Sequence, residues 1–293
     1  MSKTAEQIYH ARMQRVLDHI ERHLDEELTL ERLSGVAAFS RHHFHRQFTA
    51  LFGIPVNRYV QLMRLKRASY RLAFRNQDVT GIALDAGYEA PEAFARAFRQ
   101  RFGQTPSAFR TAPDWEPWRD VLNPLEQARS TTMHNTFDPS TVTLVDMPAT
   151  TVAVMPHRGD PARLGATIRR FIAWRREAGL TPRTSATFTV FHDPEPGNPA
   201  DFHVDLCAAT SAPLSATEAG VEAGTIPGGA CAMLKVTGAS DDLSRAANFL
   251  YREWLPASGR ETRDFPLYCR RVTFFPDVPE HEAVSELYLP IKG

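Results

Sequence analysis

Cysteine is scarce in this 293-residue sequence, where Cys207, Cys231 and Cys269 lie far apart and no C-x-x-C pair occurs. This spacing excludes a disulfide-based scaffold and a cysteine-rich zinc site, and it favours a reducing compartment. No apolar run is long enough to span a membrane. The N-terminal residues lack the apolar segment of a secretion signal, so we expect a cytoplasmic protein with no membrane partner.

Sequence signatures of catalysis are also missing. The chain has no G-x-S-x-G nucleophile elbow, no H-E-x-x-H zinc motif and no glycine-rich phosphate loop. The Gly228-Gly229 pair precedes a predicted strand and indicates a turn. We therefore predict a protein that is not an enzyme and has no catalytic residues, cofactor or metal ligands.

Charge is distributed unevenly although the net charge is zero. Residues 1–112 carry 17 Lys and Arg against 11 Asp and Glu, whereas residues 113–293 carry 17 against 23. Between Arg32 and Gln77 there are nine basic residues and no acidic one. A basic half joined to an acidic half is typical of a polyanion-binding module fused to a module of another purpose. A run of charge is more often simply a solvated surface. Other sequence patterns must therefore show whether this part of the chain binds nucleic acid.

Hydrophobic spacing divides the chain into three parts. Apolar residues recur at helical intervals up to about residue 110, with capping residues, prolines and glycines at the expected helix ends. Residues 112–140 contain several prolines and no clear periodicity, which indicates a linker. Strand and helix patterns alternate in the remainder. The predicted domains are therefore an all-α domain at 1–111, a linker at 112–140 and an α+β domain at 141–293.

A five-residue pattern occurs twice in the helical part. Phe, Arg, Phe, Phe and Gly occupy positions 44, 46, 48, 52 and 53, and recur 50 residues later at 94, 96, 98, 102 and 103. Each copy follows a short helical stretch and a tight turn, which is the order of a helix-turn-helix unit. The second helix of such a unit lies in the major groove, so two copies predict contacts with successive grooves about 34 Å apart.

The exposed side chains of these two helices are candidate contacts to bases and phosphates. Arginine donates two hydrogen bonds to guanine, and glutamate accepts one from cytosine. Two alternatives stay open: His42 and His45 have the spacing of metal ligands, and Arg96 could pair with Asp85 or Glu89. The predicted DNA-binding residues are Arg41, His42, His45, Arg46, Arg58, Glu92, Ala93, Arg96 and Arg110.

These segments resemble the DNA-binding domain of the AraC/XylS family of transcription regulators. The resemblance rests on FSRHHFHRQF at 39–48 in the first copy, and on AFARAF at 93–98 and FGQTPSAFR at 102–110 in the second. It implies seven helices, with residues 55–74 joining two helix-turn-helix units.

The sequence departs from the family pattern at two places. Ala38 stands where the family's first turn usually has glycine, and a left-handed alanine costs about 1–2 kcal/mol, so we expect a different turn. Residues 91–93 offer few donors, so we expect the second helix to rely on backbone contacts.

A second repeat, offset by 79 residues, relates strand 152–155 to strand 231–234, each followed by a glycine and a helix. It predicts two β-α-β-β halves with a ligand cleft between them. Here IPGGACA at 226–232, WLP at 254–256 and ELYLP at 286–290 resemble the GyrI-like effector-binding domain. For any single aromatic residue of this part, a plain core position is the favoured alternative. The predicted ligand-binding residues are Phe191, His203, Tyr251, Trp254, Tyr268 and Cys269.

The resemblances together imply a multidomain, sequence-specific transcription regulator whose C-terminal domain binds a small-molecule effector. Many GyrI-like domains carry a glutamate near the position of Cys269, so we expect a neutral or anionic aromatic effector rather than a cation. The implied partners are double-stranded DNA, this effector and RNA polymerase. The alternatives are a small-molecule hydrolase or drug-sequestering protein with an accessory helical domain, and a module that binds another protein.

Overall fold

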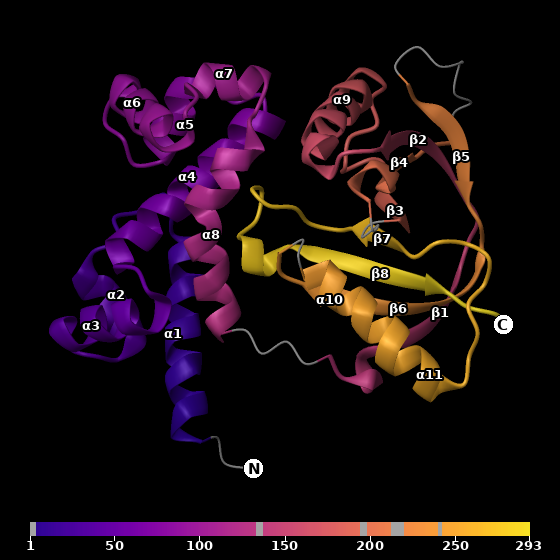
Figure 1. Ribbon diagram of the computed structural model, residues 1–293, viewed down its shortest axis with the longest axis horizontal. Coiled ribbons are helices and arrows are strands. Elements are labelled where there is room, and N and C mark those ends of the chain that lie inside the picture. The colour runs from indigo at the N-terminus through magenta and orange to yellow at the C-terminus, as the bar shows by residue number, and fades with distance from the viewer. Residues whose placement is uncertain (1–3, 133–136, 194–197, 212–219, 240–241) are drawn as a thin grey trace. The chain divides into compact units, whose positions relative to one another are not determined.

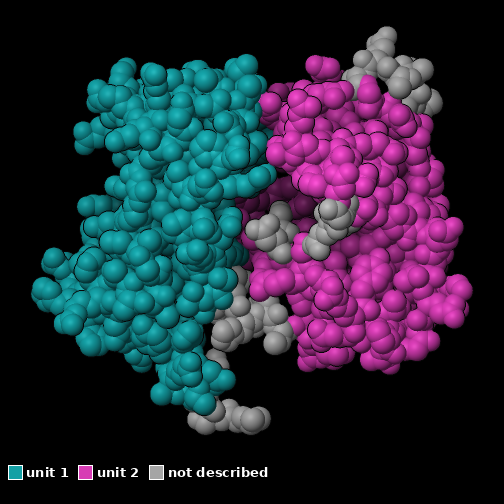
Figure 2. Space-filling model, viewed as in Figure 1, with its two compact units in different colours: residues 1–135 teal, residues 136–293 magenta. Residues whose placement is uncertain are grey.

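The computed structural model describes residues 4–132, 137–193, 198–211, 220–239 and 242–293. The chain divides into two compact units, unit 1 at Met1–Asn135 and unit 2 at Thr136–Gly293, drawn in different colours in Figure 2. Each unit has its own hydrophobic core. In the described part of the chain, no helix is both long and apolar enough to cross a membrane.

Unit 1 is entirely helical (Figure 1). Side chains of Thr29, Asp78 and Thr105 accept hydrogen bonds at the N-termini of three helices, and Gly53 and Gly103 end two others with left-handed backbone. The seven predicted helices are confirmed and an eighth follows. They are α1 (Ala5–Arg22), α2 (Leu30–Ala37), α3 (Arg41–Phe52), α4 (Val56–Phe74), α5 (Val79–Asp85), α6 (Pro91–Phe102), α7 (Pro106–Thr111) and α8 (Trp115–Thr132).

Helix α8 corrects the prediction of a linker at 112–140. Pro117 lies in its first turn, where a missing N–H costs little, and only Pro124 lies in its interior. The buried side chains recur at helical intervals and join the core of unit 1: Trp118, Leu122, Leu125 and Ala128. The prolines hid this periodicity, and tertiary packing stabilises the helix despite them.

Arginines of α4 hold the two helix-turn-helix units together. The guanidinium of Arg67 donates two hydrogen bonds to the carboxylate of Asp25, at 3.1 and 2.5 Å, and one to the carbonyl of Asp85 at 2.8 Å. Arg71 donates to the carboxylate of Asp85, and Arg64 donates to carbonyls in the α1–α2 loop. Burial lowers the pKa of Arg67, an effect that Asp25 opposes. Part of the basic run between residues 32 and 77 is therefore structural.

The turn between α2 and α3 differs from the expectation. Ala38 adopts a left-handed conformation, with φ 54° and ψ 47°, as a glycine would. The backbone N–H groups of Ala38 and Phe39 donate to the carbonyls of Gly35 and Ser34, which closes the end of α2. The turn of the family is therefore conserved in shape, although left-handed backbone at an alanine costs about 1–2 kcal/mol of conformational energy.

Unit 2 is an eight-stranded antiparallel sheet in the order β1-β6-β8-β7-β3-β4-β2-β5. This order is symmetric about the β7–β3 pair, and strands of the two halves are related by about 80 residues, which confirms the predicted pseudo-twofold repeat. The strands are β1 (Thr143–Met147), β2 (Thr150–Arg158), β3 (Thr187–Asp193), β4 (His203–Ala209), β5 (Glu222–Ile226), β6 (Gly229–Thr237), β7 (Tyr268–Arg271) and β8 (Val284–Pro290).

Connectivity forces this sheet to curl. Only two residues separate β1 from β2, although six strand spacings, or about 29 Å in a flat sheet, lie between them in the sheet order. One continuous cluster, including Val145, Val152 and Tyr268, fills the inner face. The outer face carries two separate clusters, one with α9 (Leu164–Glu177) and one with α10 (Asp242–Phe249), a π-helical turn (Leu250–Trp254) and α11 (Leu255–Ser258).

Candidate functional site

Helix α3 separates an aromatic face from a basic face. Phe44, Phe48 and Phe52 are buried, with ring centroids 5.7 and 4.6 Å apart along the series. This face anchors the helix in the core, so its orientation is fixed. The opposite side chains are all exposed to solvent: Arg41, His42, His45 and Arg46.

Helix α6 repeats this arrangement. Phe94, Phe98 and Phe102 are fully buried, with centroids 5.5 and 4.6 Å apart. Arg96 and Glu92 are exposed and Ala93 is half-buried. The carboxylate of Asp85, an alternative partner of Arg96, instead accepts hydrogen bonds from Arg71 and Gln77.

Helix α4 connects the two helix-turn-helix units. In Figure 1 α3 and α6 lie on the same side of unit 1, near opposite ends of α4. Helix α4 has 19 residues and is therefore about 28 Å long, close to the 34 Å repeat of the major groove. Arg46 and Arg96 are both exposed, and their separation on a duplex stays a prediction.

The remaining predicted DNA contacts lie at helix ends. Arg58 is half-buried in the first turn of α4. Arg110, in the last turn of α7, is also half-buried, and its guanidinium donates to the carbonyl of Gln77. Arg110 therefore has a structural contact in addition to any contact with DNA.

Three of the six predicted ligand-binding residues come together on the outer face of unit 2. Trp254 and Cys269 are buried in one cluster with Leu267 and Leu287, and Phe191 packs against that cluster. Burial raises the pKa of the Cys269 thiol. Figure 2 shows the surface of unit 2 hollowed between the parts that α9 and α10 occupy in Figure 1.

The other three residues lie elsewhere. Tyr268 is fully buried on the inner face, where its ring stacks on Tyr288 at 5.0 Å. Consecutive strand residues point to opposite faces, so Tyr268 cannot share a site with Cys269. Tyr251 is 44% exposed after α10, and His203 lies on β4. Their role in ligand binding stays a prediction.

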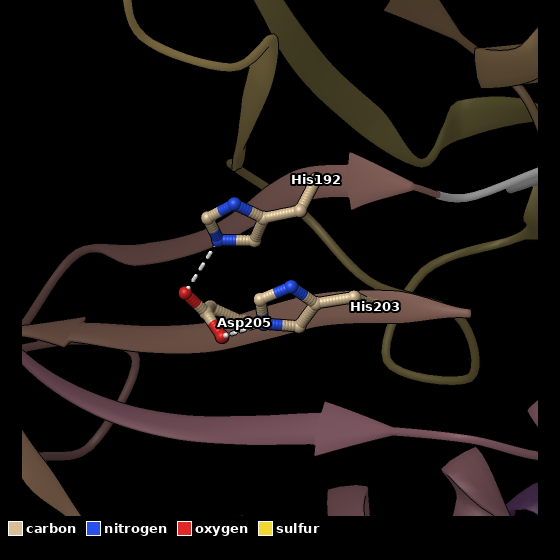
Figure 3. Close-up of side chains that lie close together, drawn as sticks. All are labelled: His192, His203 and Asp205. Atoms are coloured by element: carbon tan, nitrogen blue, oxygen red, sulfur yellow. Dashed lines mark hydrogen bonds and ion pairs between the residues drawn. The ribbon is translucent and has the colours of Figure 1, made fainter. Parts of the chain in front are cut away.

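A cluster that sequence reasoning did not assemble lies where β3 and β4 pair (Figure 3). The Nε2 atoms of His192 and His203 lie 2.7 and 3.2 Å from the two carboxylate oxygens of Asp205. The imidazole rings stack with centroids 4.0 Å apart and an interplanar angle of 8°. Burial and the neighbouring His192 lower the pKa of His203, although Asp205 opposes this shift. In the sequence, the only indication of this cluster was the spacing of His203 and Asp205, two residues apart on a predicted strand and so on one face of it.

Two family models match the chain. A model described as a GyrI-like small molecule binding domain matches residues 140–292, and a helix-turn-helix domain model matches residues 33–112. The first match covers just over half of the 293 residues, and the second contains both Phe-x-Arg-x-Phe helices. Both agree with the resemblances in the sequence.

Named relatives cover the two parts separately. "Probable transcriptional regulator YgiV" of Escherichia coli K12 is 35% identical over 152 residues, which is 51% of this chain and 95% of that protein. The "Right origin-binding protein" of the same strain is 30% identical over 129 residues, which is 44% of this chain and 43% of that protein. "Uncharacterized HTH-type transcriptional regulator YbfP" of Bacillus subtilis 168 is 36% identical over 35% of each. The chain is thus an AraC-type DNA-binding transcription regulator, and its C-terminal part belongs to the family of GyrI-like small-molecule-binding domains.

Proposed function

We propose that unit 1 reads DNA with Arg46 and His45 in one major groove and Arg96 in the next. The observation that carries this proposal is the repeated arrangement of α3 and α6, which buries three phenylalanines and exposes the matching arginine, Arg46 or Arg96, in each copy. A guanidinium on a rigid helix can bind guanine O6 and N7 with two hydrogen bonds. Because both copies lie on one chain, this proposal requires no second copy of the protein for contact with both grooves.

The N-termini of the two reading helices support phosphate contacts beside the base contacts. Within the described part of unit 1, the N-cap side chains of α3, α4 and α6 form no cap hydrogen bond, whereas α2, α5 and α7 are capped. The first N–H groups of α3 can therefore donate to phosphate oxygens, whereas α6 begins at Pro91, which has no N–H, and offers fewer such donors. We assign Arg41, Arg58 and Arg110 to further phosphate contacts, and His42, Glu92 and Ala93 to the groove surface.

Replacing Arg46 with alanine should weaken binding to a preferred duplex by about 1–3 kcal/mol, or about 5- to 150-fold, and relax the preference at one base pair. The side chain is exposed, so the fold should be unchanged. Fluorescence anisotropy at fixed ionic strength measures the affinity, and single-base variants of the duplex measure the preference.

Arg15→Ala provides a matched control because it removes the same charge from an exposed position on α1. It should leave the base preference intact and change affinity only through the general electrostatic attraction. An Arg46→Ala protein with unchanged affinity and unchanged base preference would contradict the assignment of Arg46.

We also propose that unit 2 senses an aromatic effector at the outer-face cluster that contains Phe191, Trp254 and Cys269. The apolar cluster there supports an aromatic ligand, and the fully buried, uncharged thiol of Cys269 provides no counter-charge for a cation. The effector acts only through a difference in its affinity for two states of the protein. Contact of the DNA-bound regulator with RNA polymerase is the remaining part of this proposal.

A further inference from the structure

We propose that His192, His203 and Asp205 form a three-ligand site for a divalent transition-metal ion on unit 2. One nitrogen from each imidazole and one carboxylate oxygen lie within 4.8 Å of one another. Two histidines and one carboxylate suit zinc and ferrous iron, which bind such sets and keep open positions for water or an exogenous ligand. This inference does not depend on the DNA-binding or effector proposals.

The local strand geometry brings the three side chains close together. His203 and Asp205 are two residues apart on β4 and so lie on one face. His192 is the extra residue of a β-bulge between Phe191 and Asp193, and its ring stacks on that of His203. Bulges re-aim side chains and are frequent beside functional sites. Figure 3 shows both Nε2 atoms directed toward the carboxylate.

The ligand atoms need only small shifts to accept an ion. Zinc–nitrogen and zinc–oxygen bonds of about 2.0–2.2 Å place ligand atoms of a tetrahedral site roughly 3.3 Å apart. The present Nε2–oxygen separations of 2.7 and 3.2 Å both lie slightly below that value, so these atoms would move a little apart around an ion. An ion would replace the two hydrogen bonds that now hold the cluster together.

The site is accessible and lies apart from the outer-face cluster of Phe191, Trp254 and Cys269 proposed for the effector, although His203 was among the predicted effector-binding residues. The side chains of His192, His203 and Asp205 are 32%, 18% and 17% exposed, so an ion has a path from solvent. Successive residues of β4 point to opposite faces of the sheet. Leu206 belongs to the outer-face cluster with α9, and Cys207 belongs to the inner-face cluster. Asp205 therefore lies on the same face as Cys207. Phe191, Trp254 and Cys269 belong to the outer face instead.

The test is calorimetric titration of the full chain, prepared without a histidine tag and treated with chelator, with Zn²⁺. We expect one ion per chain, and an excess of Mg²⁺ should not compete because imidazole is a poor ligand for that ion. Removing one of the three ligands should lower the Zn²⁺ affinity by at least about 10- to 100-fold, which is the loss usually seen when only a hydrogen bond that supports a ligand is removed. The variants are His192→Ala, His203→Ala and Asp205→Asn. With Co²⁺, the visible absorption of bound cobalt should disappear in the same variants.

Two controls separate this site from other histidines. His281→Ala removes an imidazole beside one carboxylate, Glu282, at 3.4 Å, and should leave Zn²⁺ affinity unchanged. His42→Ala tests the histidine pair on α3 and should also have no effect. The proposal is overturned if the native chain binds no stoichiometric Zn²⁺, or if binding survives in His192→Ala and His203→Ala but is lost in His42→Ala. Because His192 is exposed at a strand end, its variant should fold.

Discussion

Replacing Phe98 with alanine is expected to lower the unfolding free energy of unit 1 by about 3–5 kcal/mol. The Phe98 side chain is fully buried, and its ring lies 5.5, 4.6 and 5.3 Å from the rings of Phe94, Phe102 and Phe109. Tilted and edge-to-face pairs of this kind contribute more than their buried area alone. Alanine would leave a cavity between α6 and α7, and the orientation of Arg96 depends on the same packing.

Denaturation followed by far-ultraviolet circular dichroism measures this loss, with hydrogen exchange assigning it to α6 and α7. Phe98→Leu should cost only about 1 kcal/mol because most of the volume is kept. Leu84→Ala removes a side chain from a residue that is 55% exposed, and should change stability by less than about 0.5 kcal/mol. A cost below about 1 kcal/mol for Phe98→Ala would show that this aromatic series does not hold the reading helix.

Replacing Glu21 with alanine should destabilise unit 1 by about 3–5 kcal/mol, because it breaks a buried ion pair and leaves the other charge buried. The Glu21 carboxylate lies 3.2 Å from Nη1 of Arg129, and the two side chains are only 4% and 11% exposed. This pair joins α1 to α8. A large effect would therefore establish α8 as part of the DNA-binding unit.

Hydrogen exchange in the full chain distinguishes this result from a general loss of stability. Peptides of α1 and α8 should exchange faster in Glu21→Ala, whereas strands of unit 2 should not change. Glu116→Ala, at an exposed position in the first turn of α8, is the matched control and should cost less than about 0.5 kcal/mol. Fast exchange in α8 of the unmodified protein would instead favour an independent connecting segment.

The helices of unit 1 were predictable because their local signals agree with the packing. Capping side chains, helix-ending glycines and phenylalanine spacing all indicated the same elements, and the repeat extends further than the sequence suggested. Tyr59 packs edge-on against Phe48 at 75°, and Phe109, 50 residues later, packs against Phe98 at the same angle. Helix α8 escaped prediction because its stability comes from tertiary contacts rather than from its proline-containing sequence.

The site residues of unit 2 were less predictable because sequence patterns do not say which residues share a face. Tyr268 and Cys269 are adjacent in sequence and were predicted to line one site, yet they belong to cores on opposite faces of the sheet. His192 joins His203 and Asp205 only through strand pairing and a bulge, and both are set by register. Strand β5 has a weak sequence pattern and was not predicted, although its place in the repeat corresponds to β1.

The central claim is that α3 and α6 each read one stretch of the same duplex. The most direct measurement is selection of bound duplexes from random DNA by the full chain and by its Arg46→Ala and Arg96→Ala variants. We predict two short blocks of preferred base pairs about 10 base pairs apart, with each substitution weakening the preference in a different block. Selection of a single block that neither substitution changes, or of no preferred sequence, would contradict the account.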